Sequence, residues 1–178
     1  LHDEGYVVDA TGGGVRVGEA LGLIRAWGEA YQRGRFRRRS FFTLMGSDQL
    51  ESAILRANAD SGETAVFAAF SAAERQAPHV RQSKTWLYVA DEFIDTFAEH
   101  TQAREVDSGE NLVVLTPADW GVFVSFEPRS AISDRCVGCT DPAQTHVDLL
   151  RCGGRGEEAA QAVLEQCILP AWDAVRVS

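Results

Sequence analysis

The chain has 178 residues, 45% of them hydrophobic, with 17 Lys and Arg against 26 Asp and Glu, for a net charge of −9. This length and composition allow one substantial core, so we expect a single domain, and the acidic balance excludes the basic surface of a dedicated nucleic-acid binder. No stretch approaches the roughly 18 apolar residues of a membrane span, and no signal peptide is recognisable, so we expect a cytoplasmic protein.

The first residues have the composition of a linker. The chain starts at Leu1 without an initiator methionine, which suggests part of a longer protein, and Gly12, Gly13 and Gly14 are consecutive. No Gly-Lys-Ser/Thr follows this run, so it is not a phosphate-binding loop. We interpret residues 1–16 as a glycine-rich linker or tail and residues 17–178 as a single α/β domain.

Helices and strands are predicted to alternate after this linker. Apolar spacing predicts helices at 20–31, after Ser47 as a cap, from a capping box at Ser71, and after Asp91 as a cap, with strands at 40–44, 64–70 and 85–89. Residues 111–115 and 121–126 are predicted to form an antiparallel pair, and 136–139 a last short strand. The expected fold class is α/β (mixed α+β), with a central mixed sheet of about five to six strands and flanking helices.

The C-terminal part is predicted to form a helical hairpin. Asp141 is positioned to cap a first helix with Pro142 just inside its start, and glycines 153 and 154 end it. Glu157 and the residue after it favour the start of a second helix, because the macrodipole attracts negative charge there, and Pro170 is expected to stop that helix.

A cluster of cations stands out in this acidic chain. Five of seven consecutive residues are arginines, at positions Arg33, Arg35, Arg37, Arg38 and Arg39. One interpretation is a site for phosphate, nucleic acid or an acidic partner. The other, which we favour, is a solvated helix end that runs into a charged edge strand, since no interleaved aromatic residue suggests base stacking.

The sequence shows no motif for catalysis or metal binding. Cys136 and Cys139 have the spacing of half a zinc site but lack a second close pair, and the four histidines lack metal-ligand spacing. A nuclease would need clustered carboxylates, for which Asp91, Glu92 and Asp119 are the candidates. We therefore expect no catalytic residues, no metal, no cofactor and no enzyme activity.

Several elements, in order, resemble the AbiEi-type antitoxins of type IV toxin-antitoxin, or abortive-infection, systems. The resemblance covers roughly residues 18–172, with one departure at His146, where the family would have an aromatic residue. The matching residues are Trp27 to Tyr31, Leu87 to Val89, Gly121 to Phe123, Pro142 with Gln144, Asp148 with Leu149, and Gly153 to Ala160.

The resemblance implies a C-terminal antitoxin domain that counters a nucleotidyltransferase-like toxin in a bacterial phage-defence system, by direct or indirect antagonism and without a stable complex. It also implies an upstream winged helix for DNA binding and repression, which these residues do not supply. The candidate binding residues are the arginine cluster and a face formed by Gln144, Asp148 and Arg155. The alternatives are a ligand-sensing or dimerisation module of a transcription regulator and a nuclease-like or nucleotide-processing enzyme domain.

Overall fold

The computed structural model describes residues 1–10, 12–31, 37–62, 65–117, 120–124 and 137–177. Its centre is a five-stranded sheet in the order β4 (Ala65–Phe67), β5 (Thr85–Val89), β7 (Leu112–Thr116), β3 (Arg37–Phe42) and β6 (Arg104–Glu105). β5 and β7 are parallel, and the other neighbours are antiparallel. The expected mixed sheet is therefore confirmed.

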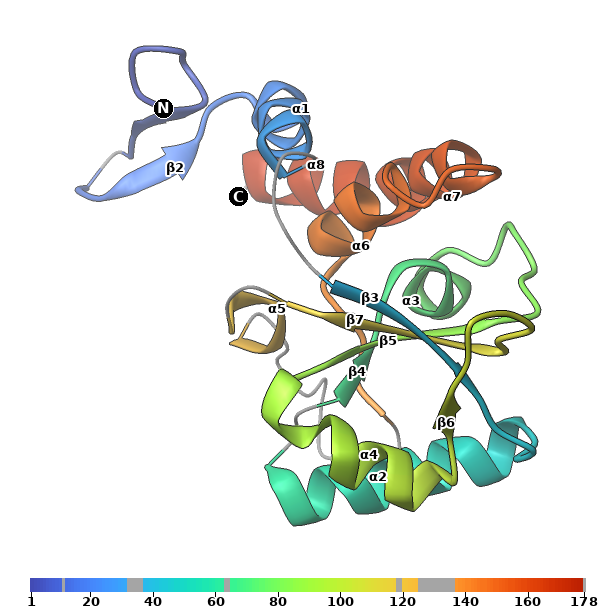
Figure 1. Cartoon of the computed structure of the whole chain (residues 1–178). Helices are drawn as coiled ribbons and strands as arrows, with labels where there is room; N and C mark the ends of the chain where they lie inside the picture. Colours follow the sequence, from blue (N-terminus) through green and yellow to red (C-terminus); the bar gives the residue numbers. More distant parts are fainter. Residues whose placement is uncertain (11, 32–36, 63–64, 118–119, 125–136, 178) are drawn as a thin grey trace.

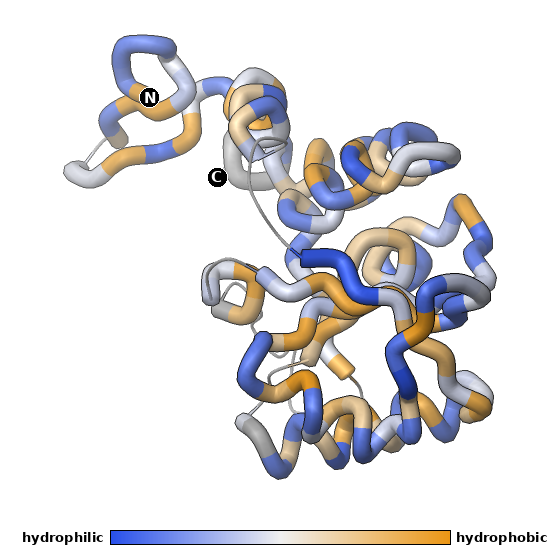
Figure 2. The backbone as a smooth tube through the Cα atoms, in the orientation of Figure 1, coloured by the Kyte–Doolittle hydropathy of each residue, from blue (hydrophilic) through white to orange (hydrophobic). Residues whose placement is uncertain are grey.

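Helices cover both faces of this sheet (Figure 1). On one face lie α2 (Ser47–Ser61) and α4 (Ile94–Thr101), and on the other α3 (Ala69–Gln76), α6 (Pro142–Leu149) and α7 (Gly156–Val163). Successive strand residues point to opposite faces, so Trp86 and Tyr88 enter one core cluster, whereas Leu87 and Val89 enter the other. Figure 2 shows the hydrophobic central strands and the hydrophilic start of β3.

An arm lies outside this core (Figure 1). We define the arm as the antiparallel hairpin of β1 (Val7–Asp9) and β2 (Val15–Val17) together with α1 (Ala20–Tyr31). Where the sequence indicated a linker, the glycines at 12, 13 and 14 have φ values of 104°, 101° and 87°, which form the hairpin turn. The helix predicted at 20–31 is confirmed, and its Gly28 faces Val147 and Leu150.

The strand predicted at 121–126 is wrong over its described part. Residues 121–124 form the short helix α5 (Gly121–Val124), and 125–126 lie outside the described residues. The physical reason is topological: β7 already pairs with β5 on one side and β3 on the other, so it offers no free edge. The predicted strand at 136–139 is reduced to a parallel bridge between Cys139 and Phe67, and Cys136 is outside the described residues.

Three predicted helix caps are wrong, and one is confirmed. α2 starts after Gly46, and α3 starts at Ala69, which leaves the Ser71 Oγ to accept a hydrogen bond from Trp86 N at 2.9 Å. Asp91 begins the short 3-10 helix η1 (Asp91–Phe93) without a side-chain cap bond. Asp141 caps α6 as expected, because its carboxylate accepts from the amides of residues 143 and 144 at 2.8 and 3.0 Å.

Pro170 does not stop the C-terminal helix. α7 continues into the π-helical turn η2 (Leu164–Ile168) and then into α8 (Leu169–Val177), with Pro170 near the start of α8. Proline removes one helical hydrogen bond and would collide with the carbonyl four residues earlier. The wider π turn just before it is a way to relieve that collision, so the helix continues through the proline.

Candidate functional site: a buried tyrosine and aspartate network

Two of the candidate residues, Gln144 and Asp148, meet inside the protein. They lie one turn apart on α6, and only 5% and 2% of their respective surfaces are exposed. Gln144 Nε2 donates to Asp148 Oδ1 at 2.8 Å, as residues spaced by four on a helix allow. The two side chains therefore face the core of the domain and not the solvent.

Two tyrosines complete the network. Tyr88, the fourth residue of β5, donates its hydroxyl proton to Asp148 Oδ1 at 2.7 Å. Tyr31, the last residue of α1, is 2.8 Å from the Tyr88 hydroxyl and accepts from Gln144 Nε2 at 2.8 Å. Because Tyr88 has only one proton, Tyr31 donates to Tyr88. All of these bonds are thus directed towards one carboxylate, and we call Tyr31, Tyr88, Gln144 and Asp148 the Tyr31 clasp.

The clasp balances two opposing effects on Asp148. Burial raises the pKa of its carboxyl, and hydrogen bonds from Tyr88, Gln144 and Tyr31 and the charge of Arg151 offset part of this rise, so that the resulting pKa is about 7. Its second oxygen, Oδ2, is buried and has no hydrogen-bond partner among the described residues. Burial together with the nearby Asp148 charge also raises the pKa values of both tyrosine hydroxyls. The carboxyl therefore changes its charge close to neutral pH.

Cationic and thiol groups surround the clasp. Arg151 Nη1 donates to the Tyr31 carbonyl at 3.1 Å, and its guanidinium lies 5.3 Å from the centre of the Tyr31 ring. Cys152 Sγ donates to the Asp148 carbonyl at 3.3 Å, and burial raises the pKa of this thiol to about 12. A thiol that is so difficult to ionise is a poor nucleophile, so it does not indicate catalysis.

The arginine cluster forms part of a strand and is paired with carboxylates. Arg33 and Arg35 lie outside the described residues. In β3, Arg37 pairs with Asp91, and Arg38 lies 3.4 Å from Glu110. Arg39 donates two hydrogen bonds to Glu105, at 2.9 and 2.6 Å. This geometry is that of a charged strand near a sheet edge, and each described cation already has an anionic partner that a ligand would have to displace.

Arg155 does not join Gln144 and Asp148. It lies exposed just before α7 and donates two hydrogen bonds to Glu158, at 2.8 and 2.7 Å. Glu158 also lies 3.1 Å from His79 Nε2. The sequence predicted one face formed by Gln144, Asp148 and Arg155. The structure brings Gln144 and Asp148 together in the interior and places Arg155 in a separate cluster on the surface.

His146, the departure from the family pattern, has a structural role. It is buried on α6, and its Nδ1 donates to the Ala160 carbonyl of α7 at 2.9 Å. Burial lowers the pKa of this imidazole, which favours the neutral ring. The residue therefore links the two helices of the C-terminal hairpin.

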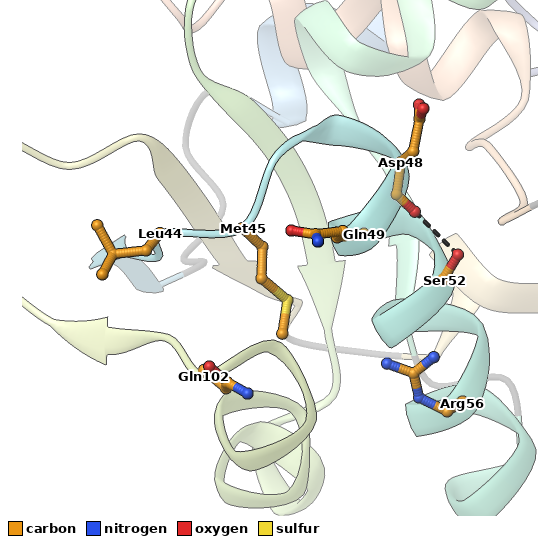
Figure 3. Close-up of a pocket in the computed structure, with 7 residues that line it drawn as sticks. All are labelled: Leu44, Met45, Asp48, Gln49, Ser52, Arg56 and Gln102. Atoms are coloured by element: carbon orange, nitrogen blue, oxygen red, sulfur yellow. Dashed lines mark hydrogen bonds between the residues drawn. The ribbon is translucent and has the colours of Figure 1, made fainter.

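A hollow is present on the opposite side of the sheet (Figure 3). Its volume is about 520 Å³, and it opens between the start of α2 and the end of α4. Leu44 at its edge is 91% exposed. The lining residues are Leu44, Met45, Asp48, Gln49, Ser52, Arg56 and Gln102. This hollow is open and its lining is about equally polar and apolar, so it differs from the closed apolar pocket expected of a ligand-sensing module.

The enzyme alternative gains no site from the described residues. Asp91 pairs with Arg37, Glu92 is exposed at the start of η1, and Asp119 lies outside the described residues. In the part of the chain that the structure describes, no three His, Cys, Asp or Glu side chains are grouped to hold a metal ion. Nor, in the same part, is any helix long and apolar enough to span a membrane.

The fold and the clasp together define a mixed α/β domain with a helical arm attached through a buried polar network. The family model described as "Transcriptional regulator, AbiEi antitoxin, Type IV TA system" matches residues 16–169. The chain therefore belongs to the AbiEi antitoxin family of type IV toxin-antitoxin systems. None of the curated proteins and none of the solved structures compared with it matched.

Sequence reasoning did not identify the two tyrosines as site residues. Tyr31 and Tyr88 were part of patterns that indicated an apolar helix face and a buried strand. A usable signal was present, because a tyrosine hydroxyl in a buried position requires a polar partner, and Gln144 and Asp148 were two polar residues on a helix otherwise facing the core.

Proposed function

We propose that this chain is the antitoxin domain of its system and that it counters a nucleotidyltransferase-like toxin. The observation that carries the proposal is the family match over residues 16–169, which covers the sheet, the helices on both faces and α1. An antitoxin family implies antagonism of a toxin. The nature of the toxin, and a cytoplasmic site of action, are part of the proposal.

The proposal assigns different roles to the buried and exposed candidate residues. Gln144 and Asp148 are buried, so they support activity by holding α1 on α6 and make no contact with a partner. The exposed candidates are the arginine edge, defined as Arg37, Arg38 and Arg39, and the residue Arg155 before α7. A polyanion or acidic partner would bind the arginine edge by replacing the carboxylates that now pair with it. DNA binding and repression are assigned to a winged helix outside this sequence.

The test is growth rescue. The neighbouring open reading frame is induced as the toxin, together with this chain alone or with the full-length protein. Rescue by this chain supports the proposal, whereas failure of both forms, each present and folded, would refute it and favour the regulator module.

The surface assignment has its own variants. If the arginine edge is the active surface, the charge reversal R37E/R39E should weaken rescue. If the surface at the start of α7 is the active one, R155E should weaken rescue instead. The matched control is R56E, a charge reversal at an exposed arginine on α2 that belongs to neither of these two surfaces. Full rescue by a folded variant would remove that surface from consideration.

A further inference from the structure

The arm has little means of staying ordered by itself. A 12-residue helix is marginal in water, and so is a two-stranded hairpin. α1 packs on α6 with Gly28 facing Val147 and Leu150, and its last residue, Tyr31, is bonded into the clasp. The order of the arm therefore depends on its attachment to the body of the domain.

The attachment at Tyr31 is polar and converges on one ionisable group. Tyr31 reaches Asp148 through Gln144 Nε2 and the Tyr88 hydroxyl, each 2.8 Å from the Tyr31 oxygen. We propose that the Tyr31 clasp is a pH-responsive latch, which holds the α1 arm closed while Asp148 is protonated and loosens it when Asp148 ionises. This inference concerns the conformation of the arm and goes beyond the antitoxin function.

The direction follows from the groups that face Asp148. These are Tyr31 from α1, Tyr88 from β5, and Gln144, Arg151 and Cys152 from α6 and the residues after it. The positive charge of Arg38, on β3, also reaches this region, because it lowers the pKa of the Cys152 thiol. Burial has the largest effect on the pKa of Asp148, and it outweighs the opposing hydrogen bond from Tyr31.

Release of α1 hydrates the carboxyl and therefore lowers its pKa towards the ordinary value. Because the released state binds the proton less tightly, raising the pH above about 7 favours release. Between the pKa of the released state and that of the closed state, Asp148 keeps its proton only when the arm is closed, and this proton holds the latch shut.

Amide hydrogen exchange of the wild-type chain, at about pH 6 and about pH 8, tests the latch. Rates are corrected for the intrinsic pH dependence of exchange, and peptides from α1 are compared with peptides from α4 on the other face of the sheet. A drop of one pKa unit on release predicts an increase of about fivefold in the opening of α1 between these pH values. Amides of α4 that exchange by local opening should show no change, whereas any that exchange only by global unfolding should follow the stability of the whole domain.

Two variants make the test specific. D148N cannot ionise, so its α1 should open equally at both pH values. Y31F keeps the ring but loses the hydroxyl, and its α1 should open more readily than the wild type at about pH 6, with α4 unchanged. The latch is overturned if wild-type α1 shows no pH effect, if D148N retains that effect, or if Y31F leaves α1 protected as in the wild type.

Discussion

Replacing Asp148 with asparagine should change how the stability of the whole domain depends on pH. The folded carboxyl has a pKa of about 7, compared with an ordinary value of 3.8 that applies to the unfolded chain. Between these values the folded protein keeps a proton that the unfolded chain has lost, so stability falls as the pH rises and levels off above about 7. D148N lacks this contribution.

The magnitude follows from the pKa difference. Each pKa unit corresponds to about 1.4 kcal/mol, so the stability of the wild type relative to D148N should fall by about 2.5 kcal/mol between about pH 5 and about pH 8. The comparison cancels the other carboxylates, which both proteins share. Because asparagine alters the hydrogen bonds of the clasp equally at every pH, it adds only a constant offset.

Urea unfolding at several pH values measures this difference. The midpoint and slope give the free energy of unfolding of each protein, and equal slopes show that the comparison is valid. A wild-type minus D148N difference that stays constant across this range would refute the reasoning. Y88F is a second check, because loss of the hydroxyl that donates to Asp148 should raise the carboxyl pKa further and move the decline to higher pH.

Further predictions concern packing, capping and surface charge, each checked by urea unfolding. G156A should destabilise by about 1–3 kcal/mol, since its new Cβ would lie 2.2 Å from the Leu149 carbonyl oxygen. G28A is its matched counterpart and should stabilise by about 0.5–1 kcal/mol, because its Cβ would make ordinary contacts of 3.6 and 3.8 Å; equal effects would contradict the packing of α1 on α6. D141A should cost about 1 kcal/mol through the lost α6 cap, whereas D48A, in the first turn of α2, should cost less. A double-mutant cycle of Arg39 and Glu105 should give a coupling below about 1 kcal/mol, and a much larger value would show that this exposed pair is more than a surface ion pair.

Local patterns in the sequence were sufficient for most of the fold. The helix at 20–31 and the Asp141 cap of α6 follow from apolar spacing and from the hydrogen bonding of a few neighbouring residues, and both were predicted correctly. Strand 85–89 was also correct, because its run of large residues is buried on both faces. These features are determined within about one or two turns of chain.

Features that depend on distant partners could not be predicted in this way. The segment at 121–124 has strand-forming residues, but β7 has both edges occupied, and only the sheet order reveals this. Asp91 satisfies the pattern of a helix cap, yet Arg37, distant in sequence, takes its carboxylate. The clasp likewise joins Tyr31, Tyr88 and Asp148 from three separate elements, so the pattern of each alone indicated only an apolar face or a strand.

The most direct test of the functional account is survival under toxin induction. The toxin encoded next to this chain is expressed at a fixed level, this chain is expressed from a separate promoter, and colony-forming units are counted against an empty vector. The account predicts that survival rises with the level of this chain and returns to that of cells without toxin. Survival equal to the empty vector, with the chain present and folded in the cells and the full-length protein equally inactive, would contradict it.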